Sequence, residues 1–363
     1  MAKTRSRPRV VKGMPSVELS RKEFVLRFHR RHEDPAFDAV SKPLDAVAEV
    51  AWKNYIEYHK SPNRRRAGSA FAEPAYELPR EWLEARKQIR EAERRQRRKS
   101  SPSRILVING SARSDQTCPG EMSKTYRLAK IAQRVIEAAP RFEVDFLDLS
   151  LLNSEYGRVI YPCKACVSTA QPLCHWPCSC YPNHAMGQTQ DWMNEIYPRW
   201  AAAHGVMILT PVNWYHVPSV LKLMIDRLVC ADGGNPDPTT TRGKNPILAK
   251  KIELKGWDYP KHLAGRAFAV AVHGDAEGVD NVRNALRDWL TTLGLIQAGE
   301  SGALGRYLGY MQPYATNHDA LDDDTAMQEE VRNAARSLVE TVRQIRSGKL
   351  KQPDAKLSAP REK

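Results

Sequence analysis

A loop of small and polar residues at positions 110–125 (GSARSDQTCPGEMSKT) carries the first side chains that could do chemistry. It offers hydroxyl groups at Ser111, Ser123 and Thr125 and a guanidinium at Arg113. Backbone N–H groups at a helix start suit a phosphate, and an arginine adds a charge-assisted hydrogen bond. The loop contains neither G-x-G-x-x-G nor G-x-x-x-x-G-K-[ST], so no dinucleotide fingerprint or Walker loop lies there. Two interpretations stay open: a phosphate site, or simple capping of the helix by Ser123.

A second group is a cluster of cysteines. Five of the seven cysteines fall within eighteen residues, with the spacing C-x2-C-x7-C-x3-C-x-C. Close thiolates suit an iron–sulfur cluster or zinc, each with four ligands. The candidate ligands are Cys163, Cys166, Cys174 and Cys178. We expect packing or redox-active thiols rather than a metal. A disulfide scaffold is not expected, because no export signal is seen and the cysteine count is odd, so we expect a cytoplasmic protein.

Strands and helices alternate from residue 104 onward. Apolar runs predict strands at residues 105–109, 143–149, 205–210, 266–274 and 295–298. Helical periodicity predicts helices at residues 123–138, 189–203, 218–230, 278–293 and 325–346. This alternation predicts an α/β fold with a parallel sheet buried on both faces. Five strands fit the flavodoxin-like, doubly wound order 2-1-3-4-5, which brings the loops 110–125, 211–218 and 273–278 to one crevice.

Three segments at this crevice resemble the NADPH-dependent FMN reductase family. They are GSARS…SKTYRLA in the first loop, TPVNWYHVPSVLKLMIDRL at residues 210–228 and AVHGDAEG at residues 271–278. The resemblance covers residues 104–346 and implies bound FMN. It assigns the FMN phosphate to Ser111, Arg113, Ser123 and Thr125. It assigns the flavin ring to Pro211, Val212, Asn213, Trp214, His273, Gly274 and Asp275. Asn213 departs from the family, which usually has Tyr there, and this affects ring stacking more than backbone contacts.

The resemblance also implies an activity. Hydride would pass from NAD(P)H through flavin N5 to a quinone, a flavin or another small acceptor, in a homodimer that covers the ring. This chemistry requires no acid or base from the protein, so we predict no catalytic residue, although Tyr215, His216 and His273 could border the ring. The first alternative is an electron-transfer iron–sulfur flavoprotein. Similar iron–sulfur flavoproteins have a compact C-x2-C-x2-C-x4–7-C run, of which only Cys163 and Cys166 match.

Positive charge is concentrated at the N-terminal end. Of the net charge of +14, residues 1–104 contribute 26 Lys and Arg against 14 Asp and Glu. We predict a basic, mostly helical extension over residues 1–103, a flavodoxin-like domain over 104–346 and a polar tail over 347–363.

The basic runs RRR (64–66) and RRQRRK (94–99) suit either phosphate contacts or a solvated helical face. We expect the solvated face, so nucleic acid is not an expected partner. A non-enzymatic binding protein acting through this basic arm is the second alternative. No apolar run reaches the 18 or so residues of a membrane span.

Overall fold

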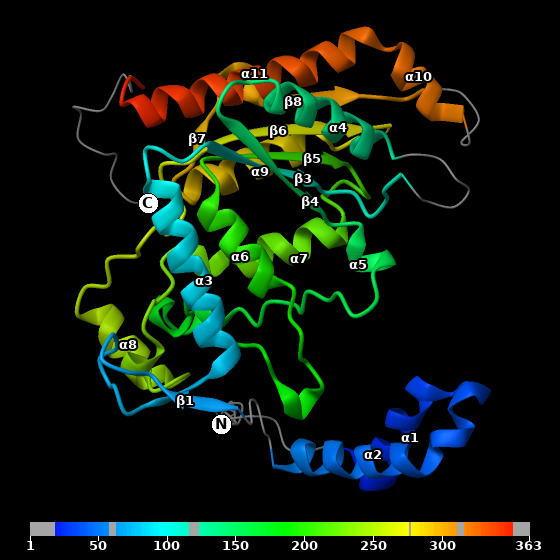
Figure 1. Cartoon of the computed structure of the whole chain (residues 1–363), viewed down its shortest axis with the longest axis vertical. Coiled ribbons are helices and arrows are strands. Elements are labelled where there is room, and N and C mark those ends of the chain that lie inside the picture. The colour runs from blue at the N-terminus through cyan, green and yellow to red at the C-terminus, as the bar shows by residue number, and fades with distance from the viewer. Residues whose placement is uncertain (1–18, 58–62, 116–122, 276, 311–315, 351–363) are drawn as a thin grey trace, which may run out of the picture. The chain divides into compact units, whose positions relative to one another are not determined.

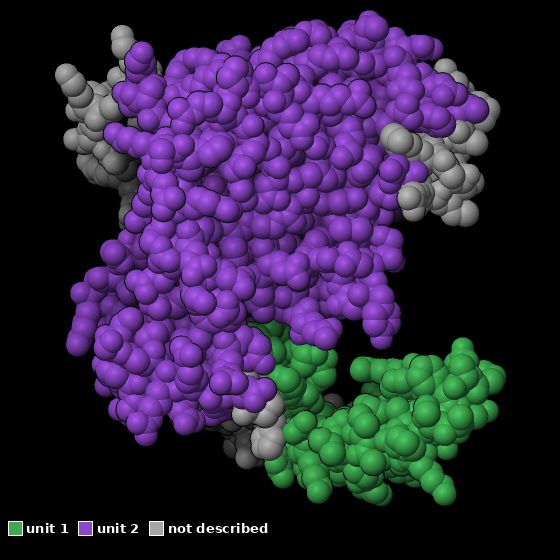
Figure 2. Space-filling view, in the orientation of Figure 1, with its two compact units in different colours: residues 1–62, 181–189 green, residues 63–180, 190–363 purple. Residues whose placement is uncertain are grey.

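The computed structural model describes residues 19–57, 63–115, 123–275, 277–310 and 316–350. The chain divides into two compact units (Figure 2). Unit 1 comprises residues 1–62 and 181–189, and unit 2 comprises residues 63–180 and 190–363. Among the described residues, no helix is long and apolar enough to cross a membrane.

Unit 2 is built on a parallel sheet with the strand order β4-β3-β5-β6-β7 (Figure 1). This is the predicted order 2-1-3-4-5. The strands along this path are β3 (Ser103–Asn109), β4 (Phe142–Asp148), β5 (Gly205–Pro211), β6 (Ala267–Gly274) and β7 (Ile296–Gln297). The sheet is therefore the doubly wound, flavodoxin-like one that the alternation of strands and helices predicts.

A sixth strand, β8 (Ala303–Tyr307), shares the edge position with β7. The short β7 pairs with the start of β6, and β8 pairs with the rest of β6 up to Gly274. Between them, Gly299 has a φ of 63° and a 3-10 turn spans Glu300–Gly302. The prediction of five strands missed β8, because the sequence GESGALGRY is rich in glycine and has no alternation of apolar and polar residues.

Helices cover both faces of the sheet. One face packs against α4 (Lys124–Glu137) and α11 (Thr325–Ser347). The other packs against α6 (Met193–Ala202), α7 (Ser219–Arg227) and α9 (Val279–Thr292). In β3, Ile105 and Val107 belong to the first cluster, and Leu106 and Ile108 belong to the second. The unbroken apolar run of this strand is thus explained by burial on both sides.

Unit 2 contains four further α-helices among its described residues. They are α3 (Arg80–Arg97), α5 (Leu151–Ser154), α8 (Pro246–Leu254) and α10 (Asn317–Asp323). The short antiparallel hairpin of β1 (Arg64–Arg66) and β2 (Glu77–Pro79) precedes α3.

Helix α3 packs on the body of unit 2. Its residue Ile89 is 2% exposed and belongs to the apolar cluster beneath the sheet. The indole Nε1 of Trp82 donates a hydrogen bond to the carbonyl oxygen of Pro177 at 2.8 Å. The residues of the predicted extension therefore fall in both units, with residues 63–103 in unit 2. The apolar stripe of α3 is narrow, but it holds the helix on the body because Trp82 and Ile89 are large side chains.

Residues 19–57 of unit 1 are mostly helical. Helix α1 (Arg21–His29) packs against α2 (Ser41–Ile56). The ring of Phe24 lies 5.4 Å from the ring of Trp52 and 5.0 Å from that of Tyr55, centroid to centroid. This aromatic cluster joins the two helices.

The burial of Ile89 gives a test of how α3 is held. Replacing Ile89→Ala should lower the free energy of unfolding by about 2–4 kcal/mol, since it removes a buried side chain from a packed cluster. The matched control Gln88→Ala, one residue earlier and exposed, should change it by less than about 0.5 kcal/mol. Urea unfolding measures both values. Equal, small effects of the two substitutions would mean that α3 is not packed on the sheet.

Candidate functional site

The carboxyl ends of β3, β5 and β6 border a cavity of about 390 Å³. Of the eleven residues predicted to hold FMN, the cavity gathers all except Trp214. Its lining consists of Ser111, Ala112, Arg113, Ser123, Lys124, Thr125, Pro211, Val212, Asn213, His273, Gly274, Asp275 and Leu308. Sequence reasoning missed Ala112, Lys124 and Leu308. Leu308 follows the unpredicted β8, and its N–H donates to the carbonyl oxygen of Gly274 at 2.8 Å.

The first loop is held by Asn109, a fully buried residue at the end of β3. Its Nδ2 donates to Asp148 Oδ1 at 2.8 Å and to the carbonyl oxygen of Arg113 at 3.0 Å. Its Oδ1 accepts from the N–H of Ser111 at 3.2 Å, and Ser111 Oγ accepts from the N–H of Arg113 at 3.1 Å. These bonds fix the backbone of Ser111 and Arg113, two of the four residues that were predicted to contact a phosphate. A polar residue that ends an apolar strand was the available signal for Asn109.

The N-terminus of α4 faces the same cavity. Ser123 caps this helix, because its Oγ accepts from the N–H of Tyr126. The capping interpretation is therefore correct, and it coexists with the cavity position of Ser123, whose Oγ lies 3.4 Å from Ser111 Oγ. The positive end of the helix dipole, the ammonium of Lys124 and the guanidinium of Arg113 all favour an anion here.

The second loop makes a tight turn over residues 213–216. The N–H of Asn213 donates to the carbonyl oxygen of His216 at 2.8 Å, and the reverse bond measures 3.0 Å. Trp214 and Tyr215 have φ values of 46° and 66°, the left-handed pair of a type I′ turn. The Trp214 side chain is 92% exposed and does not line the cavity. Trp214 therefore lies outside this cavity, and its assignment to the flavin ring stays a prediction.

The third loop contributes His273, which is buried. Its Nε2 lies 2.7 Å from Thr125 Oγ1. Burial, and secondarily the charge of Lys124, lower the pKa of His273 to about 3. The side chain is therefore neutral at physiological pH, which excludes a protonated imidazole here. Tyr215 and His216 lie on the exposed turn and do not line the cavity.

The sequence profile of the NADPH-dependent FMN reductase family matches residues 103–308, more than half of the chain. The chain belongs to this family. The match begins at β3 and ends at Leu308, so it contains every residue of the cavity lining.

The similarities of this chain to individual proteins are weaker than its match to the family profile. The iron-sulfur flavoprotein of Methanosarcina thermophila is 25% identical over 250 residues, which cover 68% of this chain and 98% of that protein. The structure of RosB with a bound 8-demethyl-8-formylriboflavin-5'-phosphate intermediate is 13% identical, with a TM-score of 0.47, over 68% of this chain and 82% of that one. FerB, an NAD(P)H:acceptor oxidoreductase of Paracoccus denitrificans, is 16% identical, with a TM-score of 0.36, over 67% and 98%.

The cysteine loop of this FMN reductase family member gathers sulfur atoms around a half-buried lysine, Lys244. The side chains in mutual contact are those of Cys166, Cys174, Cys178 and Cys180. Lys244 Nζ lies 3.6 Å from Cys166 Sγ and donates to the carbonyl oxygen of Leu173 at 2.9 Å. Cys163 was also predicted as a ligand, but it accepts a hydrogen bond from the N–H of Ala165.

The surroundings of Cys166 favour its protonated thiol. Contact with Cys174 and burial raise the pKa of Cys166 to about 11, so that its thiol is protonated at neutral pH. Across the described ranges of the chain, no group of three or more His, Cys, Asp or Glu side chains is arranged to hold a metal.

The buried His273 predicts a pH dependence of stability. Its pKa is about 3 in the folded chain and about 6.5 when unfolded, so the unfolded chain binds the extra proton as the pH falls. The free energy of unfolding should therefore fall below pH 6.5, with about 1.4 kcal/mol per pH unit from this histidine. His273→Gln should make the slope shallower, whereas His216→Gln, on the exposed turn, should leave it unchanged. Chemical unfolding between pH 4 and 7 measures the slopes, and equal slopes in both variants would contradict the burial of His273.

Proposed function

We propose that this protein is an FMN-dependent NAD(P)H oxidoreductase that reduces a quinone, a flavin or another small acceptor. One observation carries the proposal: three loops distant in sequence place ten residues of the predicted flavin site around one cavity. Membership of the FMN reductase family supports it. The cavity also lies where doubly wound sheets bind ligands, outside the carboxyl ends of the strands.

The first loop would hold the FMN phosphate. Ser111 and Ser123 place their hydroxyls 3.4 Å apart at the N-terminus of α4. The cations of Arg113 and Lys124 line the same cavity, so a phosphate dianion would meet two positive charges there. The bonds of Asn109 hold this loop in place before the ligand arrives.

Thr125 would act together with His273. We assign the Nε2–H tautomer to His273, because it would donate to Thr125 Oγ1 and leave the hydroxyl proton of Thr125 for a phosphate oxygen. A neutral imidazole has one N–H, which here would donate to Thr125. His273 would therefore position Thr125 and would not transfer a proton. This agrees with a reaction that requires no acid or base from the protein.

The second and third loops would hold the flavin ring. FMN, when bound, supplies a site that accepts and passes on hydride at N5. The two loops are tied together because the N–H of Val212 donates to the carbonyl oxygen of His273 at 2.8 Å. Any side chain at Gly274 would crowd Val212, since an added Cβ would lie 3.2 Å from the Cβ of Val212. The glycine thus lets the second and third loops pack closely along this wall of the cavity.

We also propose a homodimer. Asn213 lines the cavity, and the turn that begins there carries Trp214 and Tyr215, whose side chains are exposed. A second copy would cover the bound ring and these two aromatic side chains.

The electron-carrier alternative rests on the cysteine loop, and the name of the Methanosarcina relative favours it. We propose against it, because only Cys163 and Cys166 match the compact cysteine run of iron–sulfur flavoproteins. The protein purified without air should accordingly contain no stoichiometric iron or acid-labile sulfide.

The visible spectrum tests the proposed function. Protein purified without air and supplied with FMN should show the two absorption bands of bound flavin. These bands should bleach on addition of NADPH or NADH and return when a quinone is added. Protein that takes up no FMN would refute the proposal, and broad brown absorption with iron would favour the electron carrier.

A substitution in the first loop tests the phosphate assignment. Arg113→Ala should weaken FMN binding by about 1.5–3 kcal/mol, the loss of a charged hydrogen bond, which is about a 10- to 150-fold rise in Kd. Arg134→Ala, an exposed arginine later on α4, is the matched control and should bind FMN as the wild type does. Fluorescence titration with FMN measures both, and an unchanged Kd in Arg113→Ala would overturn the assignment.

A further inference from the structure

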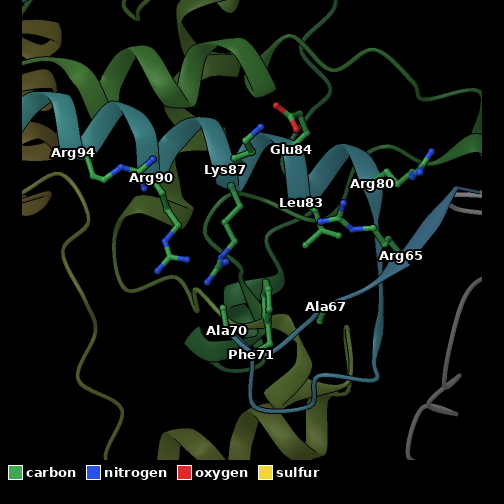
Figure 3. A pocket seen from close by; sticks show the side chains of 11 residues that line it. Arg65, Ala67, Ala70, Phe71, Arg80, Leu83, Glu84, Lys87, Arg90 and Arg94 are labelled. Atoms are coloured by element: carbon green, nitrogen blue, oxygen red, sulfur yellow. The ribbon is translucent and has the colours of Figure 1, made fainter.

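A second site of interest in unit 2 lies away from the three loops, on α3. It is a groove of about 630 Å³ between α3 and the segment of residues 65–71 that follows β1. Six cationic side chains and one acidic side chain, Glu84, line it. The cations are Arg65, Arg80, Arg86, Lys87, Arg90 and Arg94. Figure 3 shows Arg65 reaching from the hairpin toward the helix and Arg90 descending from the helix toward the loop that carries Phe71.

Carboxylates neutralise little of this charge. Among the described residues, Arg94 is the one cation of the six that forms an ion pair, with Glu91 at 3.9 Å. Burial, together with the neighbouring charge of Arg90, lowers the pKa of Arg86, although Asp237 and Glu93 act in the opposite direction. Like charges crowded in a concave site repel one another, and an anion in the groove would relieve this repulsion.

The groove has a rigid floor. Phe71 is largely buried, and the guanidinium of Arg86 lies 4.2 Å above its ring centroid. The loop after Phe71 is tied to the body, because the N–H of Ala72 donates to Asp237 Oδ2 at 2.8 Å and the N–H of Glu73 donates to Thr239 Oγ1 at 3.1 Å. The cations are thus presented on a fixed surface and not on a free arm.

The size and lining of the groove define its ligand. Arg80, Lys87 and Arg94 are seven residues apart on one helix face, so the row of cations extends over about 21 Å, more than a single phosphate needs. Ala67, Ala70 and Leu83 give the groove an apolar portion as well. A volume of this size suits a small organic molecule. We propose that the groove binds an organic polyphosphate of nucleotide size, with its phosphates on the α3 cations and its organic part over Ala67, Ala70 and Leu83.

A nucleic-acid strand fits these residues less well. Proteins that bind single strands present aromatic side chains on which bases stack. Phe71 is the aromatic residue of this lining, and Arg86 already covers its ring. The proposal does not depend on the flavin site, since no residue lines both cavities.

Calorimetric titration of the full-length protein tests the proposal, with and without saturating FMN. The probes are ATP in metal-free buffer, inorganic tripolyphosphate and a 12-nucleotide single-stranded DNA. ATP should bind the wild type more tightly than tripolyphosphate does. The double substitution Lys87→Glu with Arg90→Glu should weaken ATP binding at least tenfold, and both residues are exposed on α3. The free energy of unfolding of this variant shows whether it folds; if it does not, Lys87→Ala and Arg90→Ala singly should each weaken ATP binding several-fold.

Two controls separate the groove from other sites. Arg134→Glu replaces a cation by an acid elsewhere on the surface, as each groove substitution does, and Arg113→Ala alters the flavin cavity. Both variants should bind ATP as the wild type does. No ATP binding at millimolar concentration, or equal binding by the groove variants, would overturn the proposal. Loss of ATP binding in Arg113→Ala alone would place the nucleotide in the flavin cavity. Tighter binding of the DNA than of ATP at equal phosphate concentration would show that the groove binds nucleic acid and not a small ligand. Equal affinities for ATP and tripolyphosphate would refute the proposed role of Ala67, Ala70 and Leu83.

Discussion

The parallel pairing of β3, β5 and β6 is the constraint on which the candidate site depends. Its register sets Asn109 beside Leu209 and Pro211 beside His273, so that all three strands end at one edge. Two backbone bonds then continue the pairing past the strands, from Gly110 to Leu209 and from Val212 to His273. Each strand is buried on both faces, so a slip by one residue would bury the wrong side chains on both sides. The core strands therefore bring the loops to one edge, and contacts such as that of Thr125 with His273 then join them.

The sequence predicts this arrangement because runs such as ILVIN and GVMILT can be buried only as central strands. What it could not predict depends on long-range partners. The strand β8 has no apolar pattern and is formed by pairing with β6. Asn109 acquires its role from Asp148, which ends a different strand. The position of Trp214 follows from left-handed backbone angles that tryptophan seldom adopts, and no feature of its local sequence indicates them.

The cysteine loop is anchored at its start by a buried cation. Arg227, at the end of α7, pairs with Asp191 through Nη2 and Oδ2 at 2.5 Å, and both side chains are almost fully buried. Its Nη1 donates to the carbonyl oxygen of Tyr161 at 2.8 Å, which fixes the start of the loop. Breaking such a pair costs about 3–5 kcal/mol, because it leaves one charge unpaired in the core. Since α7 follows the second crevice loop, the segment that resembles a flavin-ring motif also anchors the cysteine loop.

The two cavities of unit 2 described above differ in their charge. In the flavin cavity, burial keeps His273 neutral, and the positive charge is limited to Arg113 and Lys124 beside a helix terminus. This is suited to one phosphate and a ring that must not be surrounded by charge. On α3, six cations crowd one groove with a single acidic neighbour in its lining. A helix that needed only solubility would gain more from mixed charges at i and i+4, which attract one another. The concentration of one sign in a concave, rigid site is explained by an anionic occupant, because only then is the repulsion among the cations offset.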